Sequence, residues 1–153
     1  MPTPEERLQE LGVSLPAPAT PVAAYVPCVR TGDLVYVSGQ VPMVDGKPSH
    51  LGHLGDDVDL EAGRAAARTC AVNVLAALKA ELGELSRVRR VVKVTGFVAS
   101  TADFTDHPKV VNAASELFGD VFGDAGRHAR AAVGVAALPL GVPVEVEAIV
   151  EVG

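Results

Sequence analysis

The sequence predicts an α+β domain in which two helices pack on one face of a mixed β-sheet. Strand-like stretches, in which apolar and polar residues alternate, and two long helical stretches follow one another in the order β-β-α-β-α-β-β. Helices that cover a sheet on one side give a two-layer domain. With 153 residues, 48% of them hydrophobic and 21% charged, we expect residues 1–153 to form one domain with a buried core.

The first 21 residues are expected to form a short helix and a linker. Thr3-Pro4-Glu5-Glu6 has the pattern of a capping box, with Thr3 as the N-cap and Glu6 reaching back to it. This helix should end at Gly12. The proline-rich residues 15–21 then predict an extended linker.

A hairpin and a long loop follow the linker. Strands are predicted over residues 23–29 and 34–37, joined by a turn at residues 30–33 in which a glycine is available for positive φ. Residues 42–59 are rich in Gly, Asp, Pro and His, which predicts a loop of the length that is often functional. His50 and His53 lie in this loop, but no cysteine or third histidine is near, so an ordinary loop is favoured over a metal site.

Two helices flank the next strand. Asp59 is expected to cap a helix over residues 60–82 that ends at Gly83 and has an apolar stripe on one side. A strand is predicted over residues 88–99. We expect Asp106 or His107 to cap the second helix, because Pro108 suits a first turn. This helix should end near residue 118 or 122.

The last two strands place one arginine, Arg130, in the otherwise apolar residues 129–138. Residues 144–152 alternate so that three glutamates share one face of the strand. If residues 138–143 form a hairpin turn, Arg130 pairs near Glu151 and lies about six residues, or roughly 20 Å, from Glu145.

Alternation also predicts which side chains the helices cover. We expect Val133 and Val135 to pack on the helices, which leaves Arg130, Ala132 and Gly134 on the uncovered face with the glutamates. Small residues on an uncovered sheet face allow another backbone to approach closely. We therefore expect this face to contact other subunits.

Arg130 has two interpretations. Desolvating a guanidinium costs several kcal/mol unless an anion meets it. In one interpretation Arg130 lies at a solvated strand end and is satisfied by Glu147 or Glu151. In the other it binds a small carboxylate, which a planar guanidinium holds through two parallel hydrogen bonds.

Three segments resemble the RidA/YjgF family. The last two strands contain its arginine, apolar run, Leu-Pro turn and Glu-x-Glu-Ala-Ile strand, and the first hairpin has Tyr25, Gly32 and the Ser38-Gly39-Gln40 triplet at the family's spacing. The third segment contains Asp103-Phe104 and Asn112. Together the segments span most of the chain in the family's order, and they are most similar to a longer subgroup labelled YjgF/chorismate-mutase-like or endoribonuclease L-PSP.

The resemblance implies a chorismate-mutase-like fold and a trimer with ligand clefts between subunits. It also implies hydrolysis of enamine or imine acids, such as 2-aminoacrylate or 2-iminopropanoate, to a 2-oxo acid and ammonia. In this interpretation Arg130 binds the substrate carboxylate and Glu145 positions the attacking water. The residues implied to line the cleft are Tyr25, Ser38, Gly39 and Asn112. No cofactor or metal is implied, because an imine is already electrophilic and positioning should suffice.

Each implied site residue also has a plainer interpretation from its position alone. Tyr25 is compatible with a strand aromatic, Ser38-Gly39 with a bulge, Asn112 with a solvated helix face and Glu145 with a solvated strand face. Two other functions therefore stay open beside the deaminase: a carboxylate-binding module without turnover, and a ribonuclease.

Composition argues against several partners. A net charge of −6, a pI near 5.1 and 4% aromatic residues disfavour nucleic-acid binding, which needs a basic face and stacking side chains. No apolar run is long enough to cross a membrane and the start does not resemble a signal peptide, so we expect a cytoplasmic protein. Cys28 and Cys70 are too few for a disulfide framework, and Cys70 is expected to be a core thiol.

Overall fold

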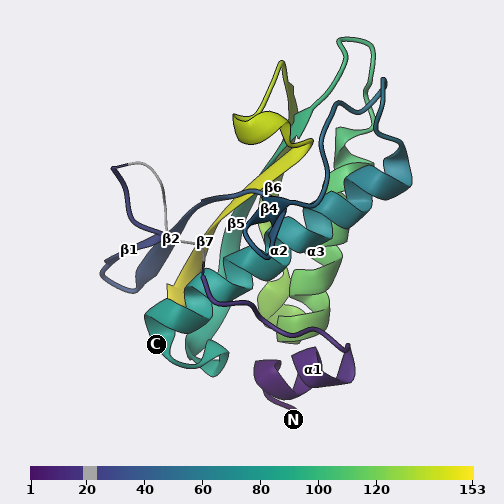
Figure 1. Cartoon of the computed structure of the whole chain (residues 1–153). Helices are drawn as coiled ribbons and strands as arrows, with labels where there is room; N and C mark the ends of the chain where they lie inside the picture. The colour runs from purple at the N-terminus through teal and green to yellow at the C-terminus, as the bar shows by residue number, and fades with distance from the viewer. Residues whose placement is uncertain (19–23) are drawn as a thin grey trace.

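The expected order of helices and strands is present in a computed structural model, which describes residues 1–18 and 24–153. Figure 1 shows a sheet crossed by the two long helices, with the short first helix at one end. The elements are α1 Pro4–Glu10, β1 Cys28–Thr31, β2 Leu34–Gln40, β3 Met43–Val44, β4 Lys47–Pro48, α2 Leu60–Leu82, β5 Val88–Ala99, α3 His107–Phe122, β6 Ala129–Val135 and β7 Val144–Val152.

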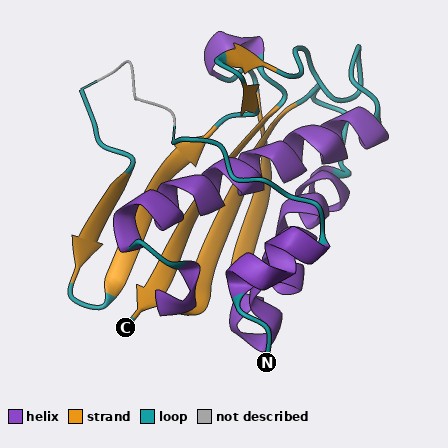
Figure 2. Ribbon diagram, turned by 60° about the horizontal axis from the view of Figure 1, so that its bottom comes forward, coloured by secondary structure: helices purple, strands orange, loops and turns teal. Residues whose placement is uncertain are grey.

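The helices form one layer and the sheet the other. α2 and α3 lie side by side on one face of the sheet, and the other face carries no helix among the described residues (Figure 2). The core lies between the layers, where Val144, Val146 and Val150 of β7 are fully buried against the helices. The predicted two-layer α+β arrangement is confirmed.

Local signals account for the ends of the helices. The side chain of Asp59 accepts a hydrogen bond from the Ala62 N–H at 2.8 Å, and Gly83 ends α2 with a φ of +83°. Thr3 and Glu6 form the expected reciprocal capping box at 3.1 and 3.0 Å. The predicted bounds of α2 and β5 are the observed ones.

The pairing of the last two strands differs from the expectation. The sheet order is β1-β2-β7-β5-β6, so β5 lies between β6 and β7, and the expected hairpin between them is wrong. β6 is parallel to β5 because α3 connects them as a crossover, and β7 then pairs antiparallel with both β5 and β2. Arg130 is therefore level with Val94 of β5, and not paired with Glu151.

The faces of β6 are the reverse of those expected. Arg130, Ala132 and Gly134 share the helix-covered side, because their β5 neighbours do: Val94 is fully buried, and Gly96 lies against Val111 of α3. Val133 instead points to the uncovered face and is 43% exposed. The alternation along β6 correctly predicted which residues share a face. The faces were assigned to the wrong sides of the sheet because the hydrophobic Val133 was expected to pack on the helices.

The N-terminal hairpin and the 42–59 segment also refine the prediction. β1 begins at Cys28, later than expected, while residues 19–23, where the linker ends and the strand was predicted to begin, lie outside the described part. The 42–59 segment contains the small β3–β4 hairpin. It is attached to the domain through Leu54, whose N–H donates to Ala99 at 2.9 Å and whose carbonyl accepts from Thr101 at 3.0 Å.

Candidate functional site

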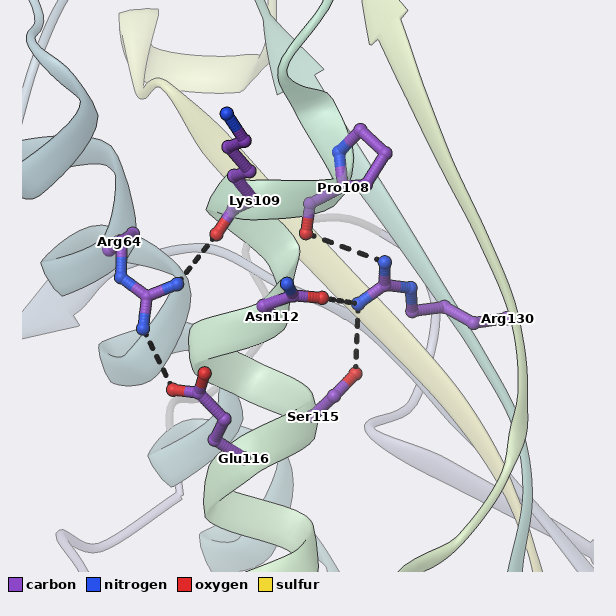
Figure 3. Close-up of polar contacts among 7 residues, drawn as sticks. All are labelled: Arg64, Pro108, Lys109, Asn112, Ser115, Glu116 and Arg130. Atoms are coloured by element: carbon purple, nitrogen blue, oxygen red, sulfur yellow. Dashed lines mark hydrogen bonds and ion pairs between the residues drawn. The ribbon is translucent and has the colours of Figure 1, made fainter.

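Arg130 extends from β6 towards α3, where neutral oxygen atoms surround its guanidinium (Figure 3). Its Nη1 donates to Asn112 Oδ1 at 2.8 Å and to Ser115 Oγ at 3.2 Å, and its Nη2 lies 3.4 Å from the carbonyl oxygen of Pro108. All three partners belong to α3. The helix therefore fixes the direction of the guanidinium but supplies no negative charge to it.

The charge of Arg130 is uncompensated within the described chain. No carboxylate oxygen of residues 1–18 and 24–153 lies within 4 Å of its guanidinium. Glu151, one of the two partners considered for a solvated strand end, instead forms an ion pair with Arg90 at 3.7 Å. The half-buried guanidinium thus has neutral hydrogen-bond acceptors but no ion-pair partner among the described residues.

Ser115 and His128 form a second layer behind Arg130. His128 Nδ1 lies 2.6 Å from the Gly126 carbonyl, so this nitrogen carries the ring proton and Nε2 accepts from the Ser115 hydroxyl at 2.8 Å. The Ser115 oxygen then accepts from Arg130. Burial lowers the pKa of His128, the Gly126 carbonyl opposes that shift, and the charge of Arg130 adds to it. His128 is half-buried.

Glu145 lies on the opposite face of the sheet. It pairs with Phe97 in β5, and its carboxylate contacts the α-carbon side of Gly39 in β2, where no side chain would fit. Burial raises the pKa of the Glu145 carboxyl, and the neighbouring charge of Glu147 raises it further. Such a carboxyl holds its proton more readily than an exposed one.

Ser38 is next to Gly39 in β2, and Tyr25 precedes β1. The β2–β7 register shifts between Val37 and Gln40, so Ser38-Gly39 is a bulge, as its plainer interpretation proposed. Ser38 Oγ donates to the Val26 carbonyl at 2.6 Å and so ties the segment before β1 to β2. Tyr25, next to Val26, has a side chain that is 55% exposed.

The sequence-predicted site residues therefore form two groups. Arg130 and Asn112 lie between β6 and α3, and Glu145 lies with Gly39 on the helix-free face. Glu145 is level with Val133, three residues beyond Arg130 along β6, with β5 between them. The two groups do not meet within one chain.

Sequence reasoning did not identify Ser115 or the Pro108 carbonyl as Arg130 partners. One signal was available for Ser115: it is three residues after Asn112, and residues with this spacing lie on the same face of a helix. The Pro108 carbonyl carries no sequence signal, because any residue type supplies the same acceptor.

The remaining candidate groups have local structural partners. His53 Nε2 lies 2.8 Å from the Ala136 carbonyl, and His50 Nδ1 lies 2.8 Å from Ser49 Oγ. Cys70 is fully buried and donates to the Val144 carbonyl, and burial raises the pKa of its thiol, as expected for a core cysteine. Among the described helices, none has the length and hydrophobicity needed to cross a bilayer.

Known proteins are similar in sequence to most of this chain. Protein TCP17 of Trypanosoma cruzi is 50% identical over 145 residues, which cover 94% of this chain and 91% of that protein. A protein of Salmonella typhimurium named 2-iminobutanoate/2-iminopropanoate deaminase is 37% identical over 133 residues, or 87% of this chain and 90% of that protein.

Structural similarity extends along the full length. A crystal structure from Shewanella oneidensis, described as a "putative endoribonuclease", superposes with a TM-score of 0.96 at 35% identity and covers 99% of this chain and 100% of that one. Residues 5–151 match the family model described as "YjgF/chorismate_mutase-like, putative endoribonuclease". With its predicted motifs in place on this fold, the chain belongs to the YjgF/chorismate mutase-like family.

Proposed function

We propose that this chain hydrolyses small 2-imino acids to 2-oxo acids and ammonia. Water adds to the imine carbon, the C–N bond breaks and the nitrogen leaves as ammonia, while the carboxylate of the substrate is unchanged. The name of the Salmonella relative supports this reaction. The chain's own support comes from the chemistry of Arg130 and Glu145.

The observation that carries the proposal is the uncompensated charge of Arg130. A guanidinium held by Asn112, Ser115 and a carbonyl of α3 has a fixed direction and no carboxylate partner in the part of the chain that the structure describes. A substrate carboxylate would provide that anion through a bidentate contact. A bound carboxylate places the adjacent imine carbon at a defined distance from the protein, which is the main requirement for attack by water.

Glu145 is proposed to handle the proton. In its ionised form it can accept a proton from the attacking water, and in its protonated form it can pass that proton to the departing nitrogen. Burial raises the pKa of the Glu145 carboxyl, which makes the protonated form more accessible than it is for an exposed glutamate. In the same proposal Tyr25, Ser38 and Gly39 line the cleft beside Glu145, and Asn112 does so beside Arg130.

The two groups of residues need a second subunit to meet. Because Arg130 and Glu145 lie on opposite sides of the sheet, we propose a homo-oligomer, most simply a trimer, in which the cleft lies between Arg130 of one subunit and Glu145 of the next. The helix-free sheet face, which exposes Val29 and Tyr36 by 53% and 45%, offers apolar surface for such an interface.

The test is ammonia release from 2-iminopropanoate, generated continuously from alanine by an amino-acid oxidase. The wild type should accelerate release over the uncatalysed rate, and Arg130→Ala should lose most of that acceleration. Arg89→Ala, which removes an exposed arginine outside the site, is the matched control and should retain it. Absence of acceleration by the wild type, with binding of pyruvate preserved, would favour the carboxylate-binding module and refute the deaminase.

A further inference from the structure

A cavity of about 600 Å³ lies beyond Arg130 at the carboxyl ends of β5 and β6. Ser100 and Thr101, which follow β5, form one wall, while Phe104 and His107 at the start of α3 form another. Gly134 of β6 lies at its base. None of these residues has a role in the proposed hydrolysis.

The cavity lies further along the face of β6 that carries Arg130. Gly134 is on the same face of β6 as Arg130, four residues further on, which corresponds to about 13 Å along the strand. The intervening residue on that face is Ala132, which has only a methyl side chain and is partly buried. His107 directly precedes Pro108, whose carbonyl contacts Arg130, so one turn of α3 borders both places.

A hydrogen-bonding pair is fixed in the cavity. Ser100 Oγ and His107 Nε2 are 3.0 Å apart, and the edge of Phe104 packs against the His107 ring with their centroids 5.3 Å apart. The pair depends on Gly134, because a β-carbon there would come within 2.5 Å of His107 Nε2 and 2.9 Å of Ser100 Oγ. Hydroxyl and imidazole together offer both a donor and an acceptor to a further group.

The charges around the cavity select against a second carboxylate. Its described lining contains no lysine or arginine. Asp103 accepts a hydrogen bond from the lining residue Thr101 at 2.7 Å, and Asp106 precedes His107. Two carboxylates near the cavity would repel an anionic group, whereas an uncharged hydroxyl or carboxamide meets only hydrogen-bonding partners.

We infer that this cavity is the subsite for the substrate's side chain, and that it selects 2-imino acids with an uncharged, hydrogen-bonding side chain. The inference rests on the proposed function, because Arg130 must bind the carboxylate for the side chain to reach Ser100 and His107. The methyl group of 2-iminopropanoate is too short to reach Ser100 and His107 from Arg130, so it leaves the subsite empty.

The test compares imines generated by an amino-acid oxidase from alanine, methionine, glutamate and glutamine. The wild type should show a kcat/KM for the glutamine imine about tenfold above that for the methionine imine, which has a similar length but no amide. The kcat/KM for the glutamate imine, whose side chain is charged, should be lower than that for the glutamine imine. Each rate is divided by that for the alanine imine, so that general losses of activity cancel.

Gly134→Ala and Ser100→Ala should each lower the glutamine-to-alanine ratio by about fivefold or more, the first by displacing the pair and the second by removing the hydroxyl. His50→Ala removes a histidine outside the cavity and should leave the ratio unchanged. Equal ratios in the wild type and both variants, with all imines hydrolysed, would refute the subsite alone. No acceleration with any imine would refute the proposed function and the subsite with it.

Discussion

Replacing Ser115 with alanine tests how Arg130 is held. The variant loses two hydrogen bonds: the one at 3.2 Å from Arg130 and the one at 2.8 Å to His128. A bond to a charged group contributes about 1.5 to 3 kcal/mol and a neutral one about 1 kcal/mol, but water can reach these half-buried groups and replace part of both. We therefore expect the free energy of unfolding to fall by about 1 to 2 kcal/mol.

The effect on ligand binding follows from what remains. Asn112 still accepts from Arg130 at 2.8 Å, so the guanidinium keeps its general position but gains freedom to turn. The dissociation constant for pyruvate should rise about three- to tenfold, corresponding to about 0.7 to 1.4 kcal/mol. Isothermal calorimetry measures this constant, and urea unfolding measures the stability. Ser86→Ala, at an exposed serine, is the control. If Ser115→Ala binds pyruvate as tightly as the wild type, Ser115 does not position Arg130.

His128 adds a pH dependence with a defined sign. Its pKa is lowered below the ordinary 6.5 by burial, partly opposed by the Gly126 carbonyl and reinforced by Arg130. The unfolded chain therefore binds the proton more readily, so stability present above pH 6.5 is lost as the pH falls through the folded-state pKa. His128→Gln puts an amide oxygen that does not titrate near the Nε2 position, and its unfolding free energy should fall less between pH 7.5 and pH 5. Parallel decreases in both proteins would contradict this account.

Three further predictions concern the proposed reaction. Glu145→Gln should bind pyruvate almost normally by calorimetry, while kcat for 2-iminopropanoate should fall at least about 100-fold because the amide cannot take up a proton. Normal turnover by this variant would support the plainer interpretation of Glu145 as part of a solvated strand face. Light scattering at micromolar concentration should give an oligomer, most simply a trimer, and a stable folded monomer would contradict the shared cleft. Imine hydrolysis should survive exhaustive chelation, and a loss restored by added metal would assign a role to His50 and His53.

The parts of the fold that the sequence predicted depend on local interactions. A capping carboxylate at Asp59 and a terminating glycine at Gly83 act within one helical turn, so the ends of α2 follow from neighbouring residues. Strand pairing depends on residues far apart in the chain. The insertion of β7 between β2 and β5 has no signal in residues 138–143, although a hairpin there was the simplest expectation.

The candidate site, like the fold, was predicted only in part from the sequence. The family motifs identified Arg130 and Asn112, and the structure joins them by a 2.8 Å hydrogen bond. The sheet face predicted for Arg130 was wrong because a single arginine among apolar residues suggests an exposed position. In the structure, oxygen atoms of α3 accept hydrogen bonds from this arginine. Ser115 and the carbonyl of Pro108 complete that set, and a sequence pattern does not reveal a partner that is a backbone carbonyl.

The corrected face of Arg130 strengthens the argument for a shared cleft. On the expected face, Arg130 and Glu145 would lie on one surface of the same chain, roughly 20 Å apart. On the observed face the sheet itself separates them. β6 is also an edge strand, so one row of its backbone N–H and C=O groups lies without a partner strand in the described sheet. An approaching subunit that presents Glu145 to this edge would complete the reaction site and cover those groups at once, so loss of the oligomer should abolish imine hydrolysis without removing Arg130 from its place on α3.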